Sequence, residues 1–320
     1  MTEPILVADI GGTNARFAIA ELEGESIFIR DSVSLKAEDF EHVRDAAEAY
    51  MESVKQYPAR ACLAVAAPVD RDEVSFTNSH WTLQKREFEE ALKFSDFRVI
   101  NDFYAAAAGV AHLNADSFVS IKVAPGDPAA PKLVIGPGTG LGQALIIPTR
   151  SGPEVIATEG GHVTFAPRTE EEFAVMAFIA REHPRVSAER LLSGRGLVNI
   201  YRALCTLEHV SPALLKASEI TAAANSGDDP IALRTVNMFC DVLGSEVGDA
   251  VLATGARGGV ILGGGILPKI REIFMNSGFV NRFLEKGRMQ AYVDGVPVRL
   301  IVDDRVALFG AAATITAQRG

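Results

Sequence analysis

The chain has 320 residues and carries 31 Lys and Arg against 41 Asp and Glu, which gives a formal net charge of −10. This acidic balance argues against a surface built to neutralise nucleic-acid phosphates. With 48% hydrophobic and 22% charged residues, the composition is typical of a globular chain with a sizeable core, and excludes a disordered, collagenous or coiled-coil protein. At this length we expect two lobes.

The N-terminus and the cysteines indicate where in the cell the protein is located. Residues 1–4 include the acidic Glu3 where a signal peptide has basic residues, and no apolar run is long enough to span a bilayer. Cys62, Cys205 and Cys240 lie far apart and form no CxxC pair, which argues against a disulfide framework or a zinc ribbon. We therefore predict a cytoplasmic protein, without a membrane partner, in which the thiols are small buried hydrophobes.

Short apolar segments bounded by Gly, Pro, Asn or Asp alternate with longer periodic ones. The short segments predict strands over residues 5–10, 15–20, 61–66, 97–100, 133–135, 143–147, 259–262 and 296–302. Apolar residues recur in steps of three and four over residues 38–55, 170–181 and 241–254, which predicts helices. Mixed strands and helices of these lengths indicate an α/β fold with covered sheets.

A strand, a Gly/Thr turn and a second strand occur twice. The first turn is Gly11-Gly12-Thr13 and the second is Gly138-Thr139-Gly140. Such a turn exposes backbone N–H groups beside a Thr hydroxyl, which together can bind phosphate oxygens. The alternative is two ordinary tight turns. Because each turn leads into a strand, and neither GxGxxG nor GxxxxGK[ST] occurs, we exclude a nicotinamide dehydrogenase and a P-loop NTPase.

A third glycine cluster, residues 263–265, follows the apolar run 260–262. Backbone without side chains allows a flat ring to lie close against it, although glycines between a strand and a helix are common.

Asn101 and Asp102 stand at the end of a predicted strand, where α/β folds display chemistry. A carboxylate there can accept the proton of a substrate hydroxyl that attacks phosphorus, so Asp102 is the candidate general base. The alternative is that one of the two residues caps the following helix.

Further polar residues match the chemistry of a sugar, whose hydroxyls both donate and accept hydrogen bonds. Glu159, His162 and Glu189 add carboxylates and an imidazole to this inventory. The alternatives are an exposed Glu189 paired with an Arg, and a structural His162. We expect Trp81 to be a core or lobe-edge anchor, and the acidic triplet 170–172 to be a solvated helix start.

Taken together, these segments resemble bacterial ATP-dependent glucokinases, within the superfamily of sugar kinases, actin and heat-shock ATPases. The matching segments keep the family order along nearly the whole chain, and they are residues 9–16, 100–103, 136–142, 159–162, 187–190, 263–266 and 308–312. Residues 163–181 contain no cysteine, which disfavours the related zinc-dependent sugar kinases.

The resemblance implies a two-lobed actin-like ATPase (ribonuclease H-like) fold, with mixed sheets flanked by helices. It implies a small lobe of residues 1–112 plus 303–320, a large lobe of residues 113–302, and a hinge that closes over glucose in a cleft. The implied reaction is phosphorylation of the 6-hydroxyl of D-glucose by ATP and Mg²⁺, with Asp102 as base. A homodimer is also implied.

The resemblance further assigns residues to each ligand. Those implied to bind the sugar are Asn78, Asn101, Asp102, Glu159, His162 and Glu189. Those implied to bind the nucleotide are Ala8, Asp9, Ile10, Gly11, Gly12, Thr13, Asn14, Gly138, Thr139, Gly140, Gly264 and Gly265. No side chain is expected to ligate Mg²⁺ directly, although Asp9 is expected to lie near it.

Two alternatives remain. One is a kinase for another hexose such as mannose, fructose or an N-acetyl hexosamine. The other is a sugar-sensing regulator without catalysis, which we disfavour because only eight residues precede Asp9 and leave no room for a helix-turn-helix. The phosphoryl donor could also be polyphosphate or ADP.

Overall fold

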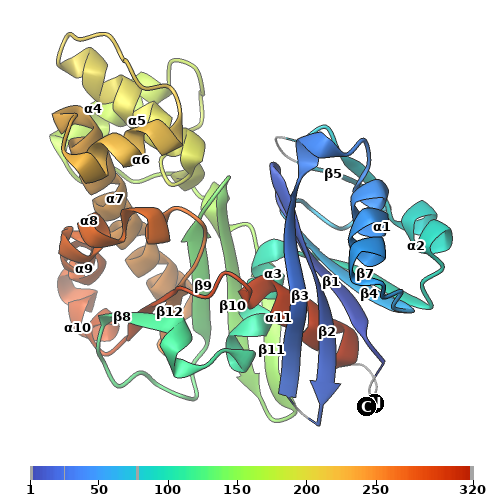
Figure 1. The fold of residues 1–320 in the computed structure, drawn as a ribbon. Coiled ribbons are helices and arrows are strands. Elements are labelled where there is room, and N and C mark those ends of the chain that lie inside the picture. Colours follow the sequence, from blue (N-terminus) through green and yellow to red (C-terminus); the bar gives the residue numbers. More distant parts are fainter. Residues whose placement is uncertain (1–2, 25, 77–78, 318–320) are drawn as a thin grey trace. The chain divides into compact units, whose positions relative to one another are not determined.

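The computed structural model describes residues 3–24, 26–76 and 79–317. The chain divides into two compact units. The first unit combines Met1–Ser117 with Asp303–Gly320, and the second unit is Phe118–Val302. Each unit is built on a mixed β-sheet with helices packed against it (Figure 1).

In its described residues, the first unit contains a five-stranded sheet, a small hairpin and four α-helices. Its strands are β1 (Ile5–Ile10), β2 (Asn14–Glu23), β3 (Ser26–Lys36), β4 (Arg60–Val65), β5 (Glu73–Ser75), β6 (Thr82–Gln84) and β7 (Asp96–Asn101). Its α-helices are α1 (Val43–Val54), α2 (Lys85–Leu92), α3 (Asp102–Gly109) and α11 (Val306–Thr316). The main sheet has the order β3-β2-β1-β4-β7.

Both faces of this sheet are covered at β1, which explains why β1 is apolar along nearly its whole length. Successive side chains of a strand point to opposite faces. Ile5 and Val7 accordingly pack with α11, whereas Leu6 and Ala8 pack with α1. In Figure 1 the helices α1 and α2 cover one face of the blue strands, and α3 and α11 cover the other. The alternation places Asp9, two residues beyond Val7, on the α11 side of the sheet.

The second unit contains a six-stranded sheet and most of the helices. Its strands are β8 (Phe118–Lys122), β9 (Lys132–Pro137), β10 (Leu141–Thr149), β11 (Gly152–Thr158), β12 (Gly259–Leu262) and β13 (Val298–Ile301). Its α-helices are α4 (Glu170–Ile179), α5 (Gly194–Leu207), α6 (Ala217–Ser226), α7 (Pro230–Thr254), α8 (Arg271–Asn276), α9 (Phe279–Leu284) and α10 (Gln290–Asp294). The sheet order is β11-β10-β9-β12-β13-β8.

Short 3-10 helices join these elements. They are η1 (Ala37–Asp39), η2 (Val110–His112), η3 (Ala115–Ser117), η4 (Gly160–His162), η5 (Ala188–Arg190), η6 (Leu267–Ile270) and η7 (Gly287–Met289).

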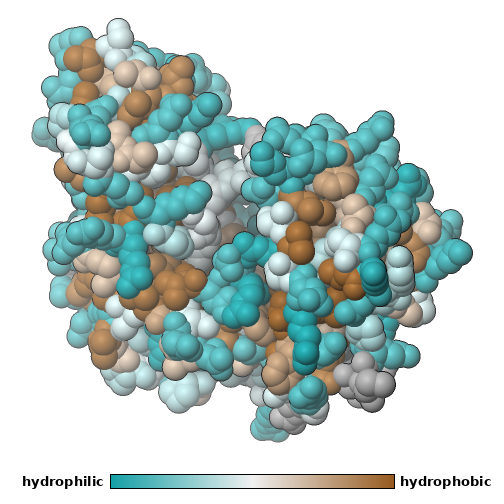
Figure 2. Space-filling model, viewed as in Figure 1, coloured by the Kyte–Doolittle hydropathy of each residue, from teal (hydrophilic) through white to brown (hydrophobic). Residues whose placement is uncertain are grey.

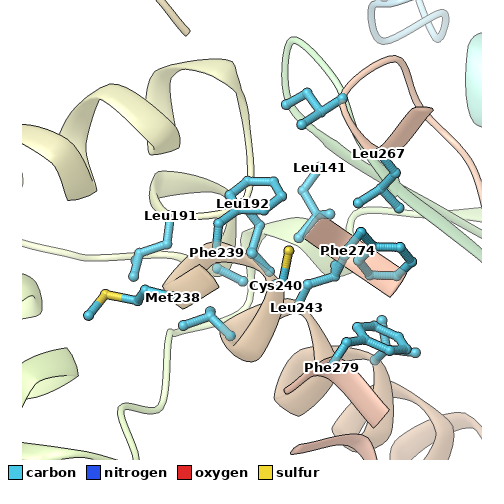
Figure 3. Close-up of a cluster of buried hydrophobic side chains, with 14 of the residues drawn as sticks. Leu141, Leu191, Leu192, Met238, Phe239, Cys240, Leu243, Leu267, Phe274 and Phe279 are labelled. Carbon is cyan, nitrogen blue, oxygen red and sulfur yellow. The ribbon is translucent and has the colours of Figure 1, made fainter. Parts of the chain in front are cut away.

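The core of the second unit forms around α7. Phe239, Cys240 and Leu243 of this helix are fully buried, and Figure 3 shows them among side chains from other segments, including Leu141 and Leu192. Leu141 begins β10 and Leu192 follows η5, so two segments that carry candidate site residues are anchored in one apolar core.

The predicted hairpins are confirmed, because β1 pairs with β2 and β9 with β10 in antiparallel fashion. The helix predicted over 38–55 begins only at Val43, because His42 adopts an extended backbone conformation and caps it. The helix predicted over 241–254 begins earlier, at Pro230, where Asp229 accepts hydrogen bonds from two backbone N–H groups of the first turn.

The expectation that residues 170–172 form a solvated helix start is wrong for Glu172. This residue is 2% exposed. Its carboxylate binds the Arg282 guanidinium of α9 through two contacts of 2.7 and 3.2 Å. The buried acid is tolerated because it has this charged partner and a further hydrogen bond from the Arg168 N–H. Trp81 is 2% exposed and donates to the Phe40 carbonyl, which confirms it as an anchor.

The surface carries both polar and apolar residues, as the overall composition leads us to expect. Hydrophilic and hydrophobic residues are interspersed over the face drawn in Figure 2. None of the helices in the described part of the chain combines the length and the apolar character that crossing a bilayer requires. The three cysteines are buried free thiols, as predicted.

Candidate active site

The first glycine turn joins β1 to β2. The Gly11 N–H donates to the Asn14 carbonyl at 2.9 Å, and the Ala37 N–H donates to the Thr13 carbonyl at the same distance. These bonds fix the turn from both sides, while the Thr13 and Asn14 side chains stay exposed. Ala8 and Ile10 are fully buried in β1.

A charged cluster lies where β1 ends. Asp9 is the cross-strand partner of Arg16 on β2. Arg16 in turn binds Asp304, with its Nη2 2.6 Å from the Asp304 carboxylate and its Nη1 2.7 Å from the Asp304 carbonyl. Burial raises the pKa of Asp9 from its ordinary 3.8 to about 6; Arg16 opposes this shift and Asp304 adds to it. Asp9 is therefore a carboxylate held in a poorly solvated position.

Asn101 and Asp102 lie at the same sheet edge as the first glycine turn. Ile10, Val65 and Asn101 end three adjacent parallel strands in matching register. Asn101 is thus two strands from the end of β1, about 10 Å at the usual strand spacing. Its Oδ1 caps α3 by accepting from the N–H groups of Phe103 and Tyr104. The capping role is therefore confirmed for Asn101, and its amide group keeps Nδ2 as a donor.

Asp102 is the first residue of α3 and partly buried, and its Oδ1 accepts from the Phe103 N–H at 2.9 Å. A carboxylate in this position can accept further hydrogen bonds through its remaining lone pairs, which is what a general base requires.

The second glycine turn joins β9 to β10 in the second unit. The Gly138 N–H donates to the Gly140 carbonyl at 2.8 Å, and the Gly194 N–H at the start of α5 donates to the Gly138 carbonyl at 2.9 Å. Thr139 is exposed between them. Like the first turn, it combines a fixed backbone with an accessible threonine.

The glycine cluster 263–265 lies directly against the end of β9. The Gly263 N–H donates to the Ile135 carbonyl, and the Ile266 N–H to that of Pro137. Gly264 has φ +82°, and a Cβ there would overlap the Pro137 carbonyl. The structure therefore joins the second turn and the third glycine cluster into one surface of nearly bare backbone.

Three candidate sugar-binding side chains converge in the second unit. His162 Nε2 lies 3.8 Å from Glu159 Oε2, and its Nδ1 lies 4.0 Å from Glu189 Oε1. Glu159 and His162 are more than half exposed, whereas the Glu189 side chain is 31% exposed. A half-exposed imidazole between two carboxylates provides neighbouring acceptors and a donor, which is the set that vicinal hydroxyls need. Glu189 is therefore less exposed than the alternative of a solvated helix carboxylate requires.

The predicted site residues form two groups, one in each unit. The first group contains Asp9, the turn 11–13, Asn101 and Asp102. The second group contains the turn 138–140, the cluster 263–265, and the Glu159, His162 and Glu189 side chains. Asn78 lies outside the described residues.

Sequence reasoning missed two residues beside these groups. Asp304 faces Arg16 from a position 288 residues away, and the acidic pair that precedes α11 is the only local signal for it. Arg185 donates to the His162 carbonyl at 2.6 Å and so holds the loop that carries the imidazole. Nothing near Arg185 in the sequence indicates this contact.

The chain is similar to known proteins over nearly its whole length. A family model described as Glucokinase matches residues 6–318. The chain is 39% identical to the glucokinase of Hahella chejuensis over 314 residues, covering 98% of this chain and 97% of that protein. The crystal structure of glucokinase from an Antarctic psychrotroph has a TM-score of 0.85 and 39% identity, covering 99% of this chain and 100% of that one.

A solved structure of lower sequence identity has a similar fold. The structure of glucokinase from Balamuthia mandrillaris in complex with glucose has a TM-score of 0.82 at 22% identity, covering 98% of this chain and 94% of that one. Together with the mixed sheets flanked by helices, these likenesses confirm the expected actin-like ATPase fold.

Proposed function

This chain belongs to the glucokinase family, and from that premise we propose that it transfers the terminal phosphoryl group of ATP to the 6-hydroxyl of D-glucose. The products are glucose 6-phosphate and ADP. The observation that carries the proposal is the convergence of Glu159, His162 and Glu189 beside a glycine-threonine turn. This places groups suited to hydroxyls next to backbone donors suited to phosphate.

Asp102 is the proposed general base. As the sugar oxygen attacks phosphorus, the hydroxyl proton passes to the Asp102 carboxylate. Asn101 donates to a neighbouring hydroxyl through Nδ2, because its Oδ1 is held by the first turn of α3. Glu159 and Glu189 accept hydrogen bonds from the remaining hydroxyls, and His162 donates to one of them. Asn78 is a further proposed sugar contact.

The proposed nucleotide site uses backbone more than side chains. The N–H groups of residues 12–13 and 139–140 bind phosphate oxygens together with the Thr13 and Thr139 hydroxyls. The bare backbone at Gly264 and Gly265 accommodates the flat adenine ring. The local positive potential comes from oriented N–H groups, so a phosphate site is compatible with the net charge of −10.

Mg²⁺ fits the residues present as an ion that arrives with the nucleotide. Within the described part of the chain no three His, Cys, Asp or Glu side chains form a metal cage. Mg²⁺ normally keeps several waters and uses one or two carboxylates besides phosphates, which the partly buried Asp9 carboxylate matches. Asp9 would hold it through its water shell, and the bound ion would neutralise charge on the phosphoryl oxygens.

The proposal includes a cytoplasmic location, because the three cysteines are free thiols, a state that a reducing compartment maintains. It also includes the homodimer that the family resemblance implies, which light scattering of the purified protein tests.

The direct test is an assay of the purified chain with glucose, ATP and Mg²⁺, in which we expect formation of glucose 6-phosphate. Parallel reactions replace glucose by mannose, fructose or an N-acetyl hexosamine, and ATP by ADP or polyphosphate. The proposal requires the highest kcat/KM with glucose and ATP. No glucose 6-phosphate above background would overturn it, and a higher kcat/KM for another sugar would reassign the substrate.

A further inference from the structure

The two carboxylate oxygens of Glu189 face different neighbours. Oε1 lies 4.0 Å from His162 Nδ1, within the polar cluster. Oε2 accepts a hydrogen bond of 3.0 Å from the Leu141 N–H. Leu141 is the first residue of β10 and follows Gly140 directly. One carboxylate therefore joins the candidate sugar cluster to the end of the second glycine turn.

The other end of the same turn is held by the same segment of chain. The Gly138 carbonyl accepts from the Gly194 N–H at 2.9 Å. Ser193 connects the two attachments, because its Oγ donates to the Glu189 carbonyl at 2.8 Å and accepts from the Gly196 N–H at 3.0 Å. Residues 189–194 thus form a clamp around the turn.

The apolar core fixes the backbone on both sides of the Glu189–Leu141 hydrogen bond. The side chains of Leu141, Leu191 and Leu192 are at most 5% exposed and belong to one cluster (Figure 3). The close approach also requires a glycine at 140, because a Cβ there would overlap Glu189 Oε2 and lie 3.2 Å from its Cδ. With the backbone anchored, the Glu189 carboxylate is the part of this connection that a ligand can reorient.

We propose that Glu189 is a positioning residue for the turn 138–140, and that it couples sugar binding to nucleotide binding within the second unit. The inference rests on the proposed function, which assigns the sugar to the Glu189 cluster and phosphate to the turn. A sugar hydroxyl bound to Oε1 orients the carboxylate, and Oε2 then holds the Leu141 N–H and the turn in place. Because such coupling is reciprocal, nucleotide binding strengthens sugar binding by the same factor.

The first test measures the affinity for a non-hydrolysable ATP analogue with Mg²⁺ and without sugar. Glu189→Ala should weaken this affinity severalfold, because the Leu141 N–H loses its acceptor. Glu189→Gln should keep it close to that of the parent chain, since an amide carbonyl can replace Oε2. Glu159→Ala is the matched control, because it removes the carboxylate on the other side of His162. Equal affinities of Glu189→Ala and Glu159→Ala would overturn the proposal.

The second test measures the coupling factor, the ratio of the analogue's Kd without glucose to that with saturating glucose. We expect a factor of about five or more in the parent chain. Gly140→Ala should reduce it towards one, because the new Cβ displaces Glu189. Gly295→Ala, outside the proposed site, should preserve it, since a Cβ there meets no atom within 4 Å. Equal coupling factors in the two variants would contradict the inference.

Amide hydrogen exchange in the unmodified chain supplies a measurement that no folding defect can obscure. Glucose alone should slow exchange at Leu141 and in residues 138–140, and unchanged exchange in glucose-saturated protein would refute the coupling. The two proposals fail differently. A chain that binds neither glucose nor the analogue contradicts the proposed function, whereas a chain that phosphorylates glucose with a coupling factor of one contradicts only this inference.

Discussion

The two units share a sheet topology but end their first hairpins differently. Strands β3-β2-β1-β4-β7 of the first unit and β11-β10-β9-β12-β13 of the second both show two antiparallel pairings followed by two parallel ones. In each unit the glycine turn follows the central strand. The same arrangement of strands therefore brings a backbone donor site to the same edge of both sheets.

The difference lies in how far the hairpin extends past its parallel neighbour. In the first unit β1 ends at its last pairing with β4, Ile10 with Val65. In the second unit β9 last pairs with β12 at Ile135 and continues to Pro137. The hairpin of β9 and β10 therefore lies against the glycine cluster 263–265, whereas that of β1 and β2 has charged side chains at its edge. The same strand topology thus presents a charged cluster in the first unit and an uncharged backbone surface in the second.

The largest expected effect tests whether a residue of the first unit, Asp102, accepts the proton. Asp102→Asn should lower kcat at least about a hundredfold, because an amide cannot accept the hydroxyl proton, while glucose still binds. Steady-state kinetics together with calorimetric glucose binding would measure both quantities. Asp116→Asn, which removes an exposed carboxylate of the same unit, should leave kcat unchanged. Retained kcat in Asp102→Asn would remove this residue as the base.

The second prediction tests the charged cluster of Asp9, Arg16 and Asp304 at the end of β1. Because burial raises the pKa of Asp9 to about 6, the folded chain binds this proton more tightly than the unfolded chain does. Ionised Asp9 therefore destabilises the fold increasingly as pH rises from 4 to 6, by up to about 3 kcal/mol at pH 7. Without nucleotide and Mg²⁺, Asp9→Asn should raise the unfolding free energy at pH 7 and have little effect at pH 4.

Denaturant titrations of parent and variant across this pH range would measure the difference. Asp116→Asn again serves as the matched removal of one charge. A stability difference between parent and Asp9→Asn that does not grow between pH 4 and 6 would contradict the raised pKa.

The smallest expected effect tests the hairpin of β9 and β10, whose first strand extends past its parallel neighbour. A Cβ at Gly136 would overlap the Gly263 backbone, whereas a Cβ at Gly11 would lie 3.7 Å from the Asn14 carbonyl, an ordinary contact. Gly136→Ala should therefore destabilise the protein by about 1–3 kcal/mol through overpacking, and Gly11→Ala should have a much smaller effect. Thermal unfolding of both variants checks this, and equal losses of stability would show that the two hairpins end alike.

Much of the fold could be predicted because its signals are local. Alternation of apolar residues around a glycine turn identified both hairpins. The start of α7 was missed although Asp229 and Pro230 provide a typical cap and buried residues recur in steps of three and four from Ala232 onwards. Glu172 was misread because its partner, Arg282, is 110 residues away.

The sequence by itself determined the strands β1, β2, β4, β7, β9, β10, β12 and β13, the two glycine-threonine turns and the polar residues at strand ends, since contiguous residues encode backbone conformation and amphipathic pattern. It did not indicate β3, β5, β6, β8 and β11. Only the tertiary structure decided which of these groups meet. The Leu141 N–H donates to Glu189, which is 48 residues away in the sequence, and Arg16 donates to Asp304, which is 288 residues away. Such contacts depend on how the packed core orients whole segments, which no local pattern of residues records.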